Sequence, residues 1–234
     1  MSELLKINNL WGGYQEGVDI LRGISMEVQQ GEAVGIIGLN GSGKSTFGKA
    51  IMNMIPIRKG EILFEGEYIT ALSTSELSHR GISIMQQGGK VFRNLSVWDN
   101  LQLAGQGRST RLVEIIPLLQ RPKKELQHLM ADKLSGGQKH QLSLAMTLAT
   151  NPRLVILDEP SAGLSPKAVE EMYQMLHNIK EKLCVTIVLI EQNVVKAASF
   201  CSRCELMNSG AIIRELVNPD ICLLEEIMFN INKD

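Results

Sequence analysis

A glycine-rich loop between an apolar segment and a helical pattern constrains the fold of this chain more than any other feature. The loop reads Gly38-Leu39-Asn40-Gly41-Ser42-Gly43-Lys44-Ser45-Thr46 and fits the pattern G-x-x-x-x-G-K-S. Apolar residues 33–37 precede it, and residues 44–54 follow with helical periodicity that stops near Pro56. A strand, a glycine loop and a helix in this order form the context in which such a loop binds phosphate. We therefore expect an α/β fold built around a phosphate-binding loop.

The residue types in this loop suit a nucleotide polyphosphate. Glycines let consecutive backbone N–H groups turn toward phosphate oxygens without Cβ clashes, and the helix N-terminus adds partial positive charge. Lys44 is expected to reach the β- and γ-phosphates, the Ser45 hydroxyl to bind Mg²⁺, and Thr46 to lie near the α-phosphate. The predicted nucleotide-binding residues of the loop are Gly38, Asn40, Gly41, Ser42, Gly43, Lys44, Ser45 and Thr46.

A second element of nucleotide chemistry lies far downstream. The apolar segment 154–157 ends in Asp158-Glu159. A carboxylate at the end of a buried strand can be aimed at the cation, which is the role we expect for Asp158. Glu159 is then placed to polarise the attacking water, as a general base or as an orienting group. A solvated turn with two acids is the alternative, and the phosphate loop in the same chain argues against it.

Leu134-Ser135-Gly136-Gly137-Gln138 lies between these two elements and belongs to neither. The three motifs in this order resemble the ATP-binding-cassette (ABC) ATPases, which power ABC transporters. The resemblance covers nearly the whole chain. It implies a P-loop NTPase (RecA-like) core with an N-terminal antiparallel β subdomain and an inserted helical subdomain. It also implies hydrolysis of ATP to ADP and phosphate, coupled to transmembrane transport.

The LSGGQ motif predicts a dimer through this resemblance. Ser135 is a plausible cap for a helix that runs to about residue 149, and glycines at the helix start allow close approach to an anion. In the family, Ser135, Gly136, Gly137 and Gln138 would face the γ-phosphate held by a second subunit, either a like copy or a companion ATPase. Residues 161–165 resemble the D-loop that crosses this interface.

Two more site residues follow from the resemblance. Residues 81–88 resemble the Q-loop, which makes Gln87 the contact to Mg²⁺ and the lytic water, with Gln86 as the alternative. Tyr14 resembles the aromatic residue that stacks on adenine, with Trp11 as its competitor and a plain surface aromatic as the third possibility.

Gln192 departs from the family pattern. Most cassettes place a γ-phosphate-contacting histidine after the strand that here spans residues 185–190, and Gln192 occupies that position. A glutamine donates a hydrogen bond but carries no charge, so a nucleotide switch with weak hydrolysis is one hypothesis. The run 189–193, with segments 88–92, 95–101 and 151–154, resembles one of the two ATPase subunits of branched-chain amino acid importers. The companion ATPase there supplies a histidine.

The coarse organisation is a core of residues 1–87 and 151–234, interrupted by a helical subdomain of residues 88–150. Helical spacing of apolar residues marks the insert. The segment between Leu101 and Leu134 is shorter than the resemblance leads us to expect, which would trim the surface that docks a membrane partner. Expected strands are 4–10, 24–28, 33–37, 61–64, 154–157, 185–190 and the hairpin 203–207 with 211–215; expected helices include 166–183 and 221–230.

Charge and hydropathy limit the kinds of molecule to which this chain is expected to bind. With 24 basic and 25 acidic residues and no basic tract, nucleic acid binding is not expected. The apolar runs fall well short of the roughly 20 residues that span a bilayer, and residues 1–10 do not resemble a signal peptide. We therefore expect a cytoplasmic protein held at the inner face of the membrane by permease subunits, and served indirectly by a solute-binding protein.

The cysteines at 184, 201, 204 and 222 include one C-x-x-C. Half a zinc site or a redox pair is possible, but no further ligand set completes it. Reduced thiols in or near the core are therefore favoured.

The favoured function is the ATPase subunit of an importer for branched-chain or other hydrophobic amino acids, with Val91 and Phe92 in the groove that receives a permease helix. Import of urea, amides or another small solute is the nearest alternative. A soluble ABC ATPase of metal-cluster assembly, translation or DNA maintenance is the alternative from another class.

Overall fold

The computed structural model describes residues 2–105 and 110–218. They fall into two compact units: unit 1 consists of residues 2–77 and 186–218, and unit 2 of residues 78–105 and 110–185. The predicted division into a core and a helical subdomain uses other boundaries, and it stays a prediction. Each unit is described by itself below.

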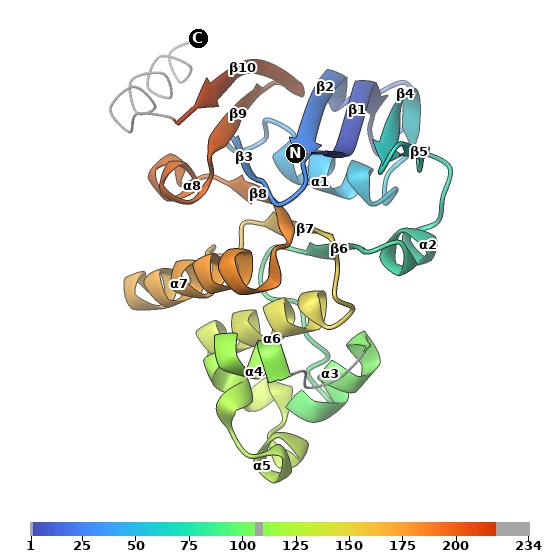
Figure 1. The fold of residues 1–234 in the computed structure, drawn as a ribbon. Helices are drawn as coiled ribbons and strands as arrows, with labels where there is room; N and C mark the ends of the chain where they lie inside the picture. Colours follow the sequence, from blue (N-terminus) through green and yellow to red (C-terminus); the bar gives the residue numbers. More distant parts are fainter. Residues whose placement is uncertain (1, 106–109, 219–234) are drawn as a thin grey trace. The chain divides into compact units, whose positions relative to one another are not determined.

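An antiparallel sheet forms the first layer of unit 1. It comprises β1 (Glu3–Gly12), β2 (Leu21–Gln29), β4 (Ile57–Phe64) and β5 (Glu67–Tyr68) in the order β2-β1-β4-β5, as Figure 1 shows. Burial alternates along β2, where Met26 and Val28 are buried and Ser25 and Glu27 are exposed. One face of the sheet therefore packs into the core, as the period of two in side-chain direction requires. The predicted N-terminal antiparallel sheet is present.

Unit 1 also contains β3 (Ala33–Ile37), β8 (Thr186–Glu191), β9 (Arg203–Asn208) and β10 (Ala211–Val217). β3 pairs in parallel with β8 and β9, and β10 pairs antiparallel with β9. Every residue of β3 and β8 is buried, so both faces are covered, as their continuous apolar sequences predicted. Helix α1 (Lys44–Ile51) contacts β8, and α8 (Val194–Phe200) contacts β3.

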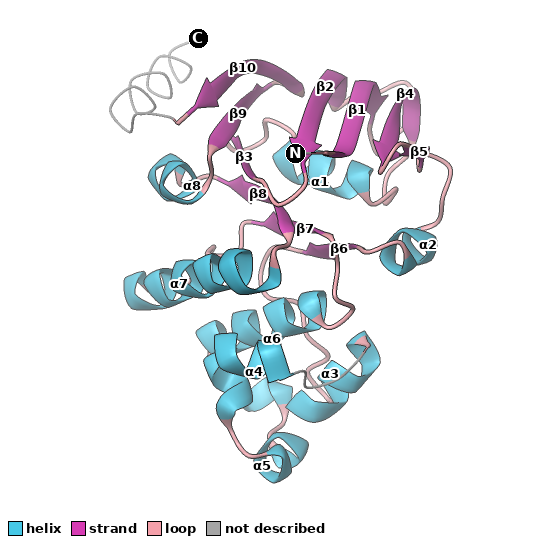
Figure 2. Cartoon of the chain, viewed as in Figure 1, coloured by secondary structure: helices cyan, strands magenta, loops and turns pink. Residues whose placement is uncertain are grey.

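Unit 2 is mainly helical, as Figure 2 shows. Its parallel strands β6 (Ile82–Met85) and β7 (Leu154–Asp158) pair with Met85 opposite Leu157. Helix α6 (Gly136–Leu148) packs on β6, α3 (Val97–Ala104) contacts α5 (Lys123–His128) and α6, and α4 (Thr110–Ile115) contacts α7 (Pro166–Leu183). The 3₁₀ turn η1 (Pro117–Gln120) lies between α4 and α5, and η2 (Ala131–Lys133) lies between α5 and α6. Helix α2 (Thr74–His79) contains a boundary between the two units. The helices predicted within residues 88–150 are therefore present.

Most predicted elements agree with the structure to within a few residues. The helix predicted at 166–183 matches α7, whereas the one predicted from Lys44 already ends at Ile51. The helix predicted at 221–230 lies outside the described residues. Within the described ranges, no helix has both the length and the apolar character needed to cross a bilayer.

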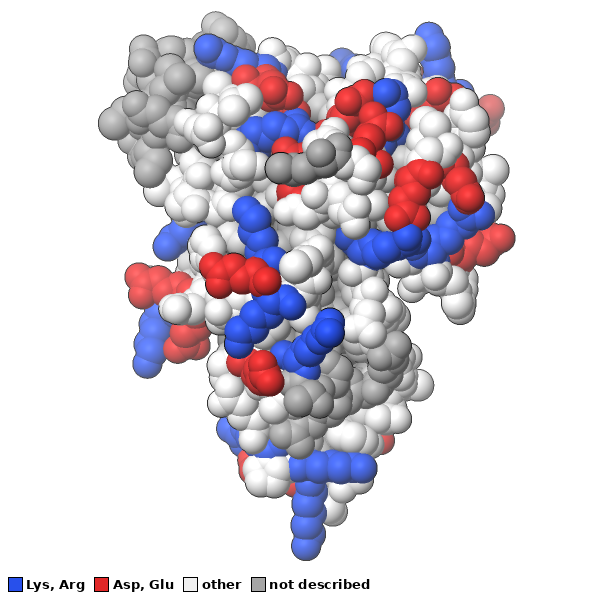
Figure 3. All heavy atoms as spheres, viewed as in Figure 1, with Lys and Arg blue, Asp and Glu red and all other residues white. Residues whose placement is uncertain are grey.

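Charged side chains of both signs are interspersed over the face shown in Figure 3. One cluster in unit 1 is centred on Arg203, whose guanidinium donates to Glu32 at 2.7 Å, to Glu215 at 3.2 Å and to Glu205. Glu205 is only 3% exposed and lies opposite Glu215 in the β9–β10 register. Burial, opposed by the charge of Arg203, raises the pKa of the Glu205 carboxyl to about 7.

This raised pKa predicts that stability falls as pH rises. The folded state holds a proton on Glu205 between the ordinary value of 4.5 and about 7, so its contribution is complete below 4.5 and is lost as pH rises through about 7. We expect the unfolding free energy of the natural chain to fall, relative to Glu205→Gln, by on the order of 1–3 kcal/mol between these limits. Urea unfolding from pH 5 to 8 measures the difference, and parallel pH profiles for the two proteins would contradict it.

Candidate nucleotide site

The phosphate loop of unit 1 joins β3 to α1. Gly38, Gly41 and Gly43 all have positive φ, at 155°, 79° and 101°, a region that other residues rarely adopt. At Gly38 a Cβ would lie 2.2 Å from the Met207 carbonyl oxygen, which rules out a side chain there. At Gly41 a Cβ would meet nothing within 4 Å, so only the backbone conformation requires glycine. The loop thus requires glycine for two reasons: the positive φ angles, and at Gly38 also the close approach of β9.

Two polar groups of the loop are buried in ways that suit an anion. Lys44 is 4% exposed, and its Nζ donates to the carbonyls of Gly38 and Leu39 at 2.9 and 2.8 Å. The ammonium is therefore held over the loop rather than in solvent. Ser42 Oγ is buried and has no hydrogen-bond partner among the described residues. A buried hydroxyl without a partner is costly, so a polar ligand in the loop fits this site.

The turn between β9 and β10 supports the loop from behind. The Gly210 N–H donates to the Ser42 carbonyl at 2.9 Å, and the Gly210 carbonyl accepts from the Arg22 N–H at 2.8 Å. Gly210 has φ of 84°, and a Cβ there would lie 1.8 Å from the Ile20 carbonyl oxygen. The residues 208–210 were predicted only as a hairpin turn. No local pattern indicates that this turn reaches a loop so distant in the sequence.

The two aromatic candidates for adenine stacking differ in accessibility. Tyr14 is 50% exposed, and its hydroxyl accepts from Lys49 Nζ on α1 at 3.3 Å. Trp11 lies within β1, where its indole N–H donates to Asn9 Oδ1 at 2.9 Å and its ring packs 3.4 Å from a Cβ built on Gly23. The indole is thus held in the sheet, and Tyr14 offers the more accessible ring.

Gln192 lies at the same sheet edge as the phosphate loop. In the parallel register of β3 and β8, Ile37 pairs with Glu191. Gln192 and Gly38 therefore each follow directly after this pair, and Gln192 is exposed. Its neighbour Asn193 caps α8 by accepting from the Lys196 N–H at 3.1 Å.

The acidic residues and the glutamine loop lie together in unit 2. Asp158 ends β7 at 2% exposure, and Glu159 follows with φ of 46°. Gln87 Nε2 donates to Glu159 Oε2 at 2.6 Å. Gln87 is exposed whereas Gln86 is half-buried, so the structure brings Gln87 to the predicted catalytic acid. The hydrogen bond fixes one oxygen of that carboxylate as an acceptor.

The LSGGQ motif forms a capped helix start. Ser135 Oγ accepts from the Gln138 N–H at 3.3 Å, and Gln138 Oε1 accepts from the Ser135 N–H at 3.0 Å. This reciprocal pair is a capping box and confirms Ser135 as the N-cap of α6. Gly136 is exposed, and a Cβ there would meet nothing within 4 Å. The helix start is therefore open to an external anion.

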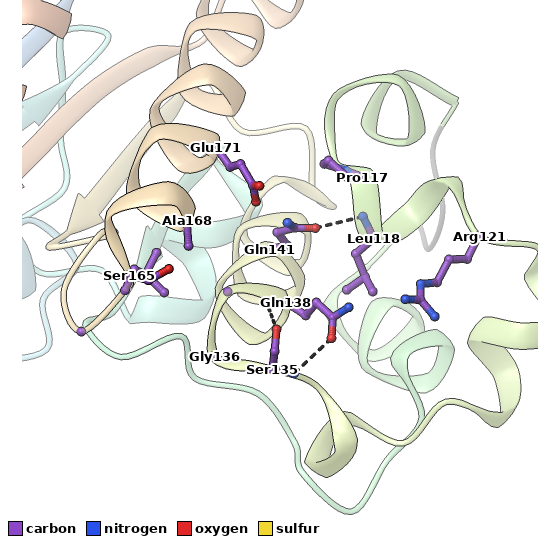
Figure 4. A pocket seen from close by; sticks show the side chains of 13 residues that line it. Pro117, Leu118, Arg121, Ser135, Gly136, Gln138, Gln141, Ser165, Ala168 and Glu171 are labelled. Atoms are coloured by element: carbon purple, nitrogen blue, oxygen red, sulfur yellow. Dashed lines mark hydrogen bonds between the residues drawn. The ribbon is translucent and has the colours of Figure 1, made fainter.

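A hollow of about 570 Å³ lies at this helix start and is shown in Figure 4. Its walls also include the N-terminus of α7, with Ser165 and Ala168, and the 3₁₀ turn η1, with Leu118. Gln141 joins two of these walls by accepting from the Leu118 N–H at 2.9 Å. The residues that line the hollow include two predicted motifs: Ser135, Gly136, Gly137 and Gln138 of LSGGQ, and Gly163, Leu164 and Ser165 of the predicted D-loop.

The C-x-x-C cysteines pack inside unit 1. Cys201 and Cys204 are buried and form no disulfide, and a Cβ on Gly35 would lie 2.7 Å from Cys204 Sγ and 3.4 Å from Cys201 Sγ. A hydrogen bond from the Cys201 thiol lowers the pKa of Cys204, against the opposing effect of burial. Among the described residues, no group of three His, Cys, Asp or Glu side chains is arranged to hold a metal ion.

Known proteins share this architecture. The family model described as ABC transporter matches residues 21–162. The high-affinity branched-chain amino acid transport ATP-binding protein BraG of Pseudomonas aeruginosa is 30% identical over 222 residues, which cover 89% of this chain and 93% of BraG. The lipopolysaccharide export system ATP-binding protein LptB of Escherichia coli K12 is 29% identical, covering 89% of this chain and 88% of LptB.

The solved structure of a nucleotide-free ATP-binding cassette from an ABC transporter superposes with a TM-score of 0.81 at 27% identity, covering 100% of this chain and 96% of that chain. This chain therefore belongs to the ABC transporter family and is an ATP-binding and ATP-hydrolysing cassette. The predicted fold class is confirmed.

The support that Gly210 gives to the phosphate loop predicts a remote effect on nucleotide binding. Gly210→Ala should displace the turn from the Ser42 carbonyl and weaken ATP binding about tenfold, which corresponds to about 1.4 kcal/mol. Gly31→Ala is the matched control, because Gly31 has φ of 77° and a Cβ there would meet nothing within 4 Å. Isothermal titration with ATP measures both variants, and equal affinities for the two would contradict the role of the turn.

Proposed function

We propose that this chain is the ATPase subunit of an importer for branched-chain or other hydrophobic amino acids. The similarity to BraG carries the proposal, because it extends over 93% of that protein and not only over the nucleotide motifs. The similarity to LptB, a lipopolysaccharide export protein, is nearly as high. The comparisons therefore support the ATPase activity more strongly than they support an amino acid as the solute. We place the chain at the cytoplasmic face of the membrane, bound to permease subunits and served indirectly by a solute-binding protein.

The phosphate loop binds the triphosphate in this proposal. Backbone N–H groups of residues 38–46 and the ammonium of Lys44 meet the phosphate charge, and Ser42 Oγ gains the hydrogen bond that it lacks within the described residues. The geometry around Tyr14 supports stacking on adenine, since its ring is accessible and its hydroxyl is tied to α1 by Lys49. Asn40 and Thr46 complete the predicted contacts of the loop.

Ser45, Asp158 and Gln87 would hold Mg²⁺, since all three present the oxygen ligands that this cation prefers. The ion supplies neutralisation of charge on the β- and γ-phosphates when it is bound. Glu159 accepts the proton of the attacking water. The 2.6 Å hydrogen bond from Gln87 orients its carboxylate for this task.

Two cassettes complete each site. The open start of α6 presents Ser135, Gly136, Gly137 and Gln138 to the γ-phosphate held by the loop of a second cassette, which is a like copy or a companion ATPase. The exposure of Gly136 and the hollow beside it support this arrangement. Gln192, which follows β8 beside the phosphate loop of its own chain, donates a hydrogen bond to the γ-phosphate held by that loop without adding charge.

A permease helix would dock on unit 2. Phe92 is 55% exposed and Leu103 is 65% exposed, and both are large apolar side chains. Phe92 is held by Asn100, whose side chain joins both the Phe92 N–H and its carbonyl. An exposed aromatic side chain on a fixed backbone, as at Phe92, suits a contact with a helix of another subunit.

Replacing the proposed base tests the ATPase cycle. Glu159→Gln keeps the shape of the side chain but cannot take a proton, so we expect ATP binding to persist, phosphate release to fall about 10²-fold or more, and an ATP-dependent dimer to accumulate. Light scattering with and without Mg-ATP measures the dimer. Lys44→Ala is the control and should stay monomeric with ATP. Normal phosphate release by Glu159→Gln would overturn the role of this residue.

Transport itself is tested with the assembled complex. An affinity-tagged chain, purified from solubilised membranes of its native cell, should carry polytopic permease proteins with it. After reconstitution into liposomes with the solute-binding protein, we expect ATP-dependent uptake of radiolabelled leucine, and none with Glu159→Gln. Recovery of the permeases with uptake of urea but not leucine would correct the solute. Recovery of no membrane protein would contradict the transport role.

A further inference from the structure

His140 lies where three functional segments of unit 2 meet. It belongs to α6, two residues after Gln138, and is only 6% exposed. Its Nδ1 is 2.7 Å from the carbonyl oxygen of Pro160, the residue that follows Glu159. A carbonyl oxygen can only accept, so Nδ1 must carry the hydrogen and donate it. Helix α6, which begins with the LSGGQ motif and is called the signature helix below, is thus hydrogen-bonded directly to the loop that follows the proposed catalytic acid.

The imidazole also packs against the glutamine loop. Gly89 has φ of 59°, and a Cβ there would lie 2.6 Å from His140 Cδ2 and 3.1 Å from Nε2. The backbone of the loop can approach the ring this closely only because residue 89 has no side chain. Gly88, its neighbour, has φ of 83°, and a Cβ on it would meet nothing within 4 Å. The two adjacent glycines therefore serve different purposes.

A further hydrogen bond joins the glutamine loop to the proposed catalytic acid. Gln87 Nε2 donates to Glu159 Oε2 at 2.6 Å. His140, on the signature helix, is hydrogen-bonded to Pro160, the neighbour of Glu159. Glu159 is hydrogen-bonded to Gln87, and Gly89 of the same glutamine loop packs against the His140 ring. All of these residues belong to the same compact unit. A shift of the start of α6 would therefore be passed to the carboxylate of Glu159 by direct contact.

We propose that His140 is a positioning residue that couples the signature helix to the catalytic acid of the same chain. The inference rests on the roles proposed above for LSGGQ and Glu159. When a second cassette's γ-phosphate engages the start of α6, the imidazole holds the Pro160 carbonyl, and with it the Glu159 carboxylate, in the orientation set by Gln87. Each chain then senses the filling of its partner's site through its own histidine.

The first experiment separates the hydrogen bond from the volume of the ring. In His140→Asn the amide nitrogen takes the place of Nδ1 and can donate to Pro160, in His140→Gln the amide lies farther out, and His140→Leu has no donor. We expect His140→Asn to retain kcat within about twofold, and the Gln and Leu variants to lose about threefold to tenfold in kcat. KM for ATP should change by less than about twofold in all three, because the phosphate loop is untouched.

A merely structural histidine would give a different result. Loss of packing would lower Tm in proportion to the volume removed, and Asn would then be worse than Leu. Wild-type kcat in the Leu variant, or a loss of kcat that Asn does not restore, would overturn the proposal. The proposed function fails separately, if Glu159→Gln hydrolyses ATP normally.

The second experiment tests the contact with Gly89. Gly89→Ala should lower kcat more than Gly88→Ala, because the two changes impose similar backbone strain but only the first drives a methyl group into the imidazole. In a His140→Ala background the ring is gone, so the two alanine substitutions should then cost the same. This cycle isolates the pair. Equal effects of the two substitutions in the natural background would overturn the contact.

Discussion

The charge of a polyphosphate dictates the shape of the loop that binds it, and the rest of the molecule supports that shape. Several backbone N–H groups must converge on one anion, which requires left-handed conformations at Gly38, Gly41 and Gly43. Such a loop does not hold itself in place. A fully buried strand β3 leads into it, the carbonyl of Met207 packs against Gly38, and the turn at Gly210 bonds to Ser42. We therefore expect the contacts of Met207 and Gly210 to determine how well the loop keeps the conformation that binds phosphate.

Hydrolysis needs a second set of groups whose positions are fixed relative to one another. In the proposed mechanism unit 2 provides them: the Gln87 amide donates a hydrogen bond to the Glu159 carboxylate, and His140, on the helix that carries LSGGQ, donates one to the Pro160 carbonyl. The phosphate loop belongs to unit 1, so in the proposed mechanism the residues that bind the triphosphate and the residue that takes the proton belong to different compact units. The open start of α6 suits the proposed cycle, in which cassettes assemble and separate.

Local patterns were sufficient to predict most of the fold. Continuous apolar runs predicted the buried parallel strands, a cap residue predicted the start of α6, and the spacing of the glycines predicted a loop with positive φ angles between β3 and α1. The prediction of a longer helix after Lys44 was wrong because the chain turns at Met52, before the proline that was taken as the stop. The support from Gly210 and the bridge by His140 were missed, since both depend on contacts between residues distant in sequence. The site roles themselves stay predictions.

The central claim is that the triphosphate held by one chain is completed by the signature helix of another. The structure of the chain with the Glu159 base disabled and Mg-ATP bound tests this most directly. We expect Ser135 Oγ and the N–H of Gly137 from a second cassette to lie within hydrogen-bonding distance of γ-phosphate oxygens. Phosphate oxygens that face solvent, or only groups of the chain that binds the nucleotide, would contradict it.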